Sequence, residues 1–199
     1  TVVPPEVIGE ADPTPNSYAM ANHSRRIFIA IANYLVWSSY EELRSGIPEE
    51  SFPTDLEEGG ANYQAFNDVI TGLVSDNESL WIFTTKATYR MFGSTKDAFY
   101  FTKVFDIGGR QTELNATAAS SNGNIAFIAN SGAIYMITDN GNTIDRISDP
   151  MPLTGGQAIT SSRWASLYFY KTATQEYLFL ASTAYPTEVT SEIYLYDVQ

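Results

Sequence analysis

The fold is decided by a segment of 13 residues, Leu80–Phe92, whose sequence is LWIFTTKATYRMF. It contains two short runs of branched and aromatic residues, Leu80–Thr85 and Thr88–Phe92, which are separated by Lys86 and Ala87. Side chains of these types fit the pleated, half-buried surface of a β-sheet. Two such runs joined by a tight connection predict a β-hairpin.

The same pattern occurs three more times along the chain. The hairpin-like segments begin at Ile27, Leu80, Ile125 and Ala165. The second and third of these starts lie 45 residues apart, and the fourth follows 40 residues later. A strand-based repeat of about 40–50 residues is typical of β-propeller blades.

Short flanking segments extend two of these hairpins to four strands. The second hairpin is preceded by Val69–Val74 and followed by Phe99–Phe105, and the third lies between Asn115–Ser120 and Thr143–Ile147. The first and fourth repeats are less complete, and no segment shows sustained helical periodicity. We therefore expect an all-β fold, a propeller-like array of antiparallel blades with about four blades or part of a larger propeller.

The segments outside the hairpins differ from them in composition. Residues 1–17 hold four of the nine prolines and predict an extended arm, which precedes the blades of residues 18–199. A proline- and glutamate-rich acidic insert, residues 41–62, lengthens the first repeat. Tyr40–Ser45 and Tyr63–Phe66 could each form one helical turn at most.

Composition excludes several classes of function. The 199 residues include 23 acidic and 11 basic side chains, one histidine and no cysteine, for a net charge of −12. Without cysteine there is no disulfide or thiol nucleophile, and a nucleic-acid groove needs clustered Lys and Arg. No apolar run reaches the length of about 18 residues that predicts a transmembrane helix. Because the chain lacks an initial Met and ends inside the strand-like Glu192–Gln199, we expect a longer polypeptide.

Candidate catalytic side chains are few. A Ser-His-Asp triad would have to use His23, and the polar segment around it favours an exposed loop instead. Glycoside hydrolysis needs two opposed carboxylates, but a dense acidic run is typical of a solvated loop. We therefore assign no catalytic, cofactor-binding or metal-binding residue. The acids of that run are Glu41, Glu42, Glu49, Glu50, Asp55, Glu57 and Glu58, with Arg44 as the one base among them.

Three further motifs have structural interpretations. Thr138–Thr143 has the composition of a calcium loop, but its Asn-Gly pair between two strand-like runs favours a tight turn. Gly108-Gly109 and Gly155-Gly156 match no phosphate-loop motif, and we interpret them as blade connections that need positive φ. The tryptophans lie in or beside the hairpins, which favours core packing over a sugar platform. They are Trp37, Trp81 and Trp164.

The order of these segments resembles the tail nozzle proteins of short-tailed phages, a family that includes tail tubular protein B and tail accessory or stabilisation proteins. The resemblance covers about residues 24–150 and lies in segment order and hydrophobic pattern, with no catalytic signature. The segments that carry it are Arg26–Ala30, Leu35–Ser39, Phe66–Leu73, Leu80–Gly93, Phe101–Gly109 and Gly123–Ile137.

The resemblance implies a structural virion protein that acts without a cofactor in the phage tail. Its members form a ring, here expected to be a homo-hexamer, through which the genome is ejected. The implied partners are other tail proteins, such as the tail adaptor and tail fibres. DNA would pass without tight binding, because a chain of net charge −12 offers few contacts to phosphates. The candidate contact elements are residues 1–17 and residues 41–62.

Two other classes of function stay open, since fold alone does not settle function. The first is a carbohydrate- or protein-binding propeller module, which exposed aromatics in blade loops would support if they formed a patch. Candidates for such a patch are Tyr40, Tyr63 and Tyr185. The second is a propeller glycosidase, with acids of the central face as catalysts.

Overall fold

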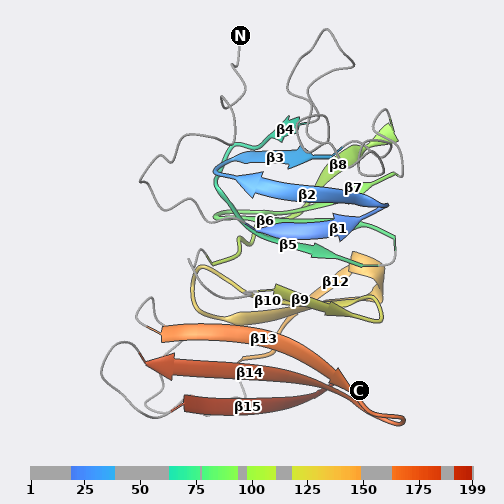
Figure 1. Cartoon of the computed structure of the whole chain (residues 1–199). Coiled ribbons are helices and arrows are strands. Elements are labelled where there is room, and N and C mark those ends of the chain that lie inside the picture. Colours follow the sequence, from blue (N-terminus) through green and yellow to red (C-terminus); the bar gives the residue numbers. More distant parts are fainter. Residues whose placement is uncertain are drawn as a thin grey trace, which may run out of the picture.

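The described residues form four antiparallel β-sheets that are stacked face to face (Figure 1). The predicted arm of residues 1–17 and the acidic insert of residues 41–62 lie outside the residues described. The computed structural model describes residues 19–38, 63–76, 78–93, 98–110, 118–148, 163–184 and 191–198.

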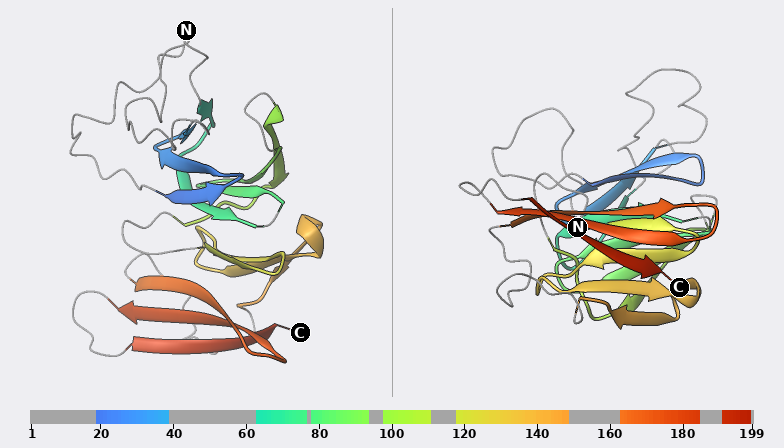
Figure 2. Two further views of the ribbon diagram at one scale, coloured as in Figure 1. Left: turned by 45° about the vertical axis from the view of Figure 1, so that its right-hand side comes forward. Right: turned by 90° about the horizontal axis from the view of Figure 1, so that it is seen from below.

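Each sheet is an up-and-down blade whose strands follow chain order, and Figure 2 shows the stack from two further directions. Blade 1 consists of β1 (Met20–His23), β2 (Arg26–Ile31), β3 (Tyr34–Trp37) and β4 (Tyr63–Ala65). Blade 2 consists of β5 (Ile70–Ser75), β6 (Leu80–Thr84), β7 (Thr88–Phe92) and β8 (Tyr100–Phe105). Blade 3 consists of β9 (Ala118–Ser121), β10 (Asn124–Ile128), β11 (Ile134–Thr138) and β12 (Thr143–Arg146). Blade 4 has three described strands, β13 (Arg163–Lys171), β14 (Glu176–Ala184) and β15 (Ser191–Val198).

The four predicted hairpins are confirmed as β2–β3, β6–β7, β10–β11 and β13–β14. Two expectations about blade 1 were wrong. It is a complete four-stranded sheet, and Tyr63–Ala65 is the strand β4 rather than a helical turn. Both β1 and β4 are short and carry polar residues, so their strand conformation depends on pairing with β2 and β3 rather than on local pattern.

Burial along the strands shows why the sheets stack. Every residue of β6 is buried, and four of the five residues of β10 are buried. In β2, by contrast, buried positions alternate with partly exposed ones. Blades 2 and 3 are therefore covered on both faces, whereas blade 1 buries one face more deeply than the other.

Three apolar clusters hold the four blades together. Between blades 1 and 2 lie Phe28, Ala30, Leu35, Trp37, Phe66, Ile70, Leu73, Leu80, Ile82 and Met91. Between blades 2 and 3 lie Val74, Trp81, Phe83, Ile125, Phe127, Ala129 and Ile137. Between blades 3 and 4 lie Ala126, Ile128, Ile134, Met136, Ile147, Leu167, Phe169, Leu178 and Leu180. The core interpretation of Trp37 and Trp81 is thus confirmed, and the side chain of Trp164 lies outside the described part.

Two tight turns connect strands of blade 3, and one of them is the turn predicted in Thr138–Thr143. Asn122 and Gly123 join β9 to β10 with φ values of 49° and 81°, the left-handed pair that a tight hairpin turn requires. Thr138–Thr143 is likewise a short connection between β11 and β12, built around the 3-10 turn η2 (Asp139–Gly141). Gly155-Gly156 lies outside the described residues.

The reason given for Gly108-Gly109 was wrong, because neither glycine has a positive φ. A Cβ on Gly108 would lie 2.3 Å from the backbone of Thr85, and a Cβ on Gly109 would lie 2.8 Å from the side chains of Phe83 and Thr71. The connection from blade 2 to blade 3 needs glycine for close approach rather than for backbone conformation.

Replacing Gly108 by alanine is expected to lower the free energy of unfolding by about 1–3 kcal/mol, because the added Cβ must displace the backbone of the β6–β7 turn. Urea unfolding measures the change. Gly123→Asn is the matched control, since asparagine tolerates positive φ and a Cβ on Gly123 would meet only the side-chain oxygen of Asn140, at an ordinary contact distance of 3.5 Å. Equal losses in the two variants would contradict the close-approach explanation.

Candidate protein interface

The expectation that His23 lies in an exposed loop was wrong. His23 lies on β1 and is 5% exposed. Its Nδ1 is 2.8 Å from Oγ of Ser75 in blade 2, and its ring lies 6.3 Å from that of Phe28. Pairing of β1 with β2 turns the ring towards the boundary between blades 1 and 2.

The His23–Ser75 pair is not completed to a triad by the adjacent Asp76. One carboxylate oxygen of Asp76 accepts the backbone N–H groups of Glu78 and Ser79, at 2.8 and 2.7 Å. The other accepts the indole N–H of Trp81 at 2.8 Å. Burial alone would raise the pKa of Asp76, but these hydrogen bonds outweigh it and hold the pKa below its ordinary value. Asp76 therefore fixes the β5–β6 turn.

Burial lowers the pKa of His23 below its ordinary value of 6.5, although nearby Asp76 acts in the opposite direction. The unfolded chain thus takes up a proton at a higher pH than the folded chain does. We expect the free energy of unfolding to be maximal above pH 6.5 and to fall as the pH drops below it. The slope can reach about 1.4 kcal/mol per pH unit until the folded pKa is passed.

This prediction is tested by urea unfolding between about pH 7.5 and 5.5, above the range in which ordinary carboxylates titrate. Because His23 is the one histidine of the chain, His23→Gln should flatten the profile over this interval. If the free energy of unfolding falls equally with pH in the native protein and in His23→Gln, the pH dependence does not come from His23.

Two polar groups join neighbouring blades. Arg90 lies over the rings of Trp81 and Phe92, at 5.0 and 4.4 Å, and donates to the backbone carbonyl of Asn140 in blade 3. The carboxylate of Glu176 in blade 4 accepts hydrogen bonds from three side chains of blade 3, namely Ser121, Asn122 and Asn124. Both groups therefore form contacts that join neighbouring blades.

Blade 4 presents a large exposed apolar face. Leu167, Phe169, Leu178 and Leu180 point from β13 and β14 into the core with blade 3. Because side chains alternate along a strand, the residues between them point to the opposite face. That outer face, which we name the blade 4 outer face, carries the apolar and aromatic side chains Tyr168, Tyr170, Tyr177, Phe179, Ala181, Ile193 and Leu195, together with the polar Ser166 and Asp197.

Strand register makes these side chains contiguous. Phe179 of β14 is paired with Tyr168 on one side and with Leu195 on the other, which gives an apolar row across three strands. Tyr170 packs edge-on against Phe179, with the ring centroids 6.0 Å apart. Tyr168 is 67% exposed and Leu195 is 57% exposed.

Ile193 adds to this patch and is 70% exposed. In blade 1, at the other end of the stack, Met20 is 68% exposed and has Ile29 as its register partner. Exposed large apolar side chains therefore occur on both terminal blades, with the denser group on blade 4. Such contiguous exposure is typical of interaction surfaces.

The aromatic patch lies elsewhere than the sequence suggested. Tyr40 and Tyr185 are outside the described residues, and Tyr63 is partly buried on β4 against the ring of Tyr34, 6.0 Å away. The signal for the true patch was the segment Leu167–Tyr170, in which every residue is apolar or aromatic. Such a run predicts a strand covered on both faces.

Within the residue ranges that the structure describes, no group of three or more His, Cys, Asp or Glu side chains is placed to hold a metal ion. The same ranges hold no helix with the length and apolar character needed to cross a bilayer. The acids of residues 41–58 lie outside these ranges.

No protein-family model matches the chain. No curated protein matches it either. Among solved structures, it is similar to the computationally designed protein Ika4, with a TM-score of 0.53, 12% identity and 94% of each chain covered. It is also similar to the designed protein Ika8, with a TM-score of 0.50, 12% identity, and coverage of 88% of this chain but 44% of Ika8. The N-terminal domain of Nup159 matches with a TM-score of 0.47 and 13% identity, over 92% of this chain and 44% of that domain. At this level of identity the likeness concerns the fold alone, and the chain is an all-β, propeller-like stack of four blades.

Proposed function

We propose that this chain is a protein-binding propeller module with a structural rather than a catalytic role. The observation that carries the proposal is the blade 4 outer face, where Tyr168, Leu195 and Ile193 are each more than half exposed. Leaving such a surface in water is unfavourable by about 25 cal/mol per Å2 of apolar area, so covering it drives association.

The chemistry of the face favours protein over sugar as its ligand. Tyr168, Tyr170 and Asp197 offer a sugar stacking rings and hydrogen-bonding groups, but Ile193, Leu195 and Ala181 beside them offer neither. Aliphatic side chains around aromatic anchors are typical of the buried core of protein interfaces. On the opposite face of the same blade, Leu178 and Leu180 pack on blade 3. That contact already joins two sheet faces made of aliphatic side chains. The expected ligand is therefore another apolar sheet face, packed about 10 Å away.

Two measurements test this proposal. Light scattering gives the mass of the native assembly, and a glycan panel shows whether the protein binds sugars. We expect the native particle to be heavier than one denatured polypeptide of this protein, and we expect no glycan binding. A particle that contains this chain alone and binds glycans through Tyr168 would overturn the proposal in favour of the carbohydrate-binding module.

A more specific candidate is a subunit of a phage tail nozzle ring. It is supported by the order of hydrophobic segments over residues 24–150, which resembles that family, and by the net charge of −12. An acidic conduit repels the phosphates of a passing genome, because phosphate contacts need Lys and Arg. Neighbouring subunits or further blades would cover the blade 4 outer face.

Electron microscopy of the source particles, with the intact mass of the native protein, tests this candidate. Six-fold rings at the tip of a phage tail and a mass greater than that of 199 residues would support it. Isolation of the protein from cells or particles that contain no phage tail would exclude it, while leaving the protein-binding module intact.

A further inference from the structure

Two Asn-Gly pairs lie side by side at one end of blade 3. Asn122-Gly123 joins β9 to β10, and Asn140-Gly141 lies in the turn η2 between β11 and β12. Both asparagines are exposed and have a positive φ, of 49° and 52°. Asparagine before glycine is especially prone to deamidation, because glycine has no side chain to keep its backbone nitrogen away from the asparagine side chain. The two pairs share this sequence and differ in their surroundings.

The surroundings of the second pair hold it in place. The backbone carbonyl of Asn140 accepts a hydrogen bond from Arg90, whose guanidinium lies over the ring of Trp81. A Cβ on Gly141 would lie 2.6 Å from the same ring, so this glycine is packed against blade 2. Attack on the asparagine side chain requires the peptide between the two residues to rotate, and this packing resists the rotation.

The first pair is less restrained. The β9–β10 ladder pairs Ser121 with Asn124, so Asn122 and Gly123 form a turn outside the ladder. A Cβ on Gly123 would meet only the side-chain oxygen of Asn140, at 3.5 Å. The amide of Asn122 donates a hydrogen bond to Glu176, at 2.9 Å, and this bond lies at the protein surface. Exposed turns open at a low cost in free energy, so Asn122 reaches the reactive conformation more often than Asn140 does.

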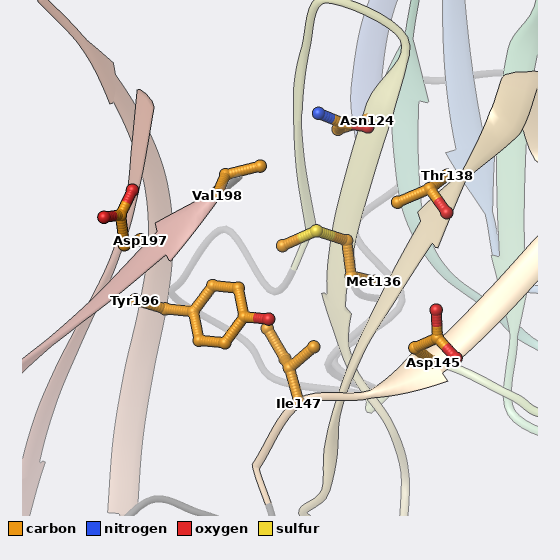
Figure 3. Close-up of a pocket in the computed structure, with 8 residues that line it drawn as sticks. All are labelled: Asn124, Met136, Thr138, Asp145, Ile147, Tyr196, Asp197 and Val198. Carbon is orange, nitrogen blue, oxygen red and sulfur yellow. The ribbon is translucent and has the colours of Figure 1, made fainter. Parts of the chain in front are cut away.

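Asn122 also belongs to the contact between blades 3 and 4. The carboxylate of Glu176 in β14 accepts hydrogen bonds from Asn122, Ser121 and Asn124. Glu176 is paired in register with Val198 of β15, and Figure 3 shows Val198 and Asn124 lining one cavity from opposite blades. This cavity, of about 650 Å3, interrupts the packing of the two blades beside Glu176. The hydrogen bonds of Glu176 therefore join the blades where side-chain packing does not.

We propose that Asn122 is a site of spontaneous deamidation, and that its product weakens the contact between blades 3 and 4. The backbone nitrogen of Gly123 loses its proton to solvent and forms a bond to Cγ of Asn122. The bond between Cγ and Nδ2 breaks, and Nδ2 leaves as ammonia with a proton from solvent. Water then opens the resulting succinimide ring at either carbonyl, which yields aspartate or isoaspartate.

Neither product can make the contact of Asn122. A carboxylate oxygen replaces Nδ2, which donates to Glu176 at 2.9 Å, so a hydrogen bond is lost and two negative charges face each other. Isoaspartate also lengthens the backbone of the turn by the Cβ atom, which disturbs the pairing of Ser121 with Asn124. Deamidation therefore changes the charge and the turn geometry at one contact.

Incubation of the full chain in warm, mildly alkaline buffer tests the site. Chymotrypsin cleaves after Phe127 and Tyr135, which separates the two Asn-Gly pairs, and mass spectrometry of the peptides measures the loss of each amide. We expect Asn122 to deamidate at least about fivefold faster than Asn140 in the folded chain, and the two rates to become similar in concentrated urea. Equal rates in the folded chain, or a faster reaction at Asn140, would overturn the assignment of the site.

Variants test the effect on the blade contact. Asn122→Asp imitates the charge of the product and should lower the urea midpoint by about 0.3 M or more. Asn140→Asp, which adds the same charge outside the contact with Glu176, should lower it less. Adding Glu176→Gln to Asn122→Asp should restore part of the loss, because the glutamine amide donates to the new carboxylate. Equal losses in Asn122→Asp and Asn140→Asp, or a loss that Glu176→Gln does not reduce, would overturn the proposed weakening of the contact.

Discussion

Replacing Tyr168 and Leu195 together by glutamate is expected to weaken association of the native assembly at least about 100-fold. Both side chains are more than half exposed and belong to one apolar row, so the folded chain loses little internal packing. Anchor residues at the centre of a protein interface typically contribute about 2 kcal/mol or more each. Every 1.4 kcal/mol is about a tenfold change in affinity, and the buried charges add a further penalty.

Sedimentation velocity over a dilution series measures this effect. Tyr100→Glu is the matched control, because Tyr100 on blade 2 is 64% exposed and lies off the blade 4 outer face. Thermal unfolding of both variants should stay close to that of the native chain. Equal association of the native protein and the double variant would mean that the face is not used.

Replacing Phe127 by alanine is expected to lower the free energy of unfolding by about 3–5 kcal/mol. Phe127 is fully buried between blades 2 and 3. Its ring lies 4.7 Å from that of Phe83 and 5.7 Å from that of Tyr135, so truncation removes contacts on both sides and leaves a cavity. A loss of this size is a large fraction of the stability of a typical domain.

Urea unfolding measures the loss, with Phe127→Leu and Tyr100→Ala as references. The leucine variant fills part of the space and should lose less than the alanine variant, whereas the exposed Tyr100 should change stability by less than about 0.5 kcal/mol. A small effect of Phe127→Ala would mean that blades 2 and 3 do not share a core.

The hairpins could be predicted from sequence because their signals are local. Branched and aromatic runs such as Leu80–Thr84 and Ile134–Thr138 flank short polar turns, and Asn122-Gly123 has the residue types that a left-handed turn demands. The spacing of about 40–50 residues between hairpins then predicted the propeller-like repeat.

The elements that were missed depend on contacts distant in sequence. The strand β1, with the sequence MANH, has no strand-like pattern and forms because β2 offers it an edge. The same pairing buries His23 against Ser75, which lies 52 residues away in the chain. Gly108 was predicted to lie in a connection between blades. Its close approach to Thr85, however, is a tertiary contact that no local pattern specifies.

The candidate interface could be predicted in part from the sequence. Apolar residues on both faces of a strand, as in Leu167–Tyr170, imply that both faces are covered. Only the register of β13, β14 and β15 shows that Tyr168, Phe179 and Leu195 form one row.

Hydroxyl-radical footprinting of the native assembly tests whether the blade 4 outer face docks protein. Tyr168 and Tyr100 are reactive side chains with similar exposure, 67% and 64%, in the isolated chain. We expect assembly to protect Tyr168 and Leu195 from oxidation, whereas Tyr100 should be oxidised equally in the assembled and the dissociated protein. Oxidation of Tyr168 that is the same in both states would contradict the claim that the blade 4 outer face docks protein.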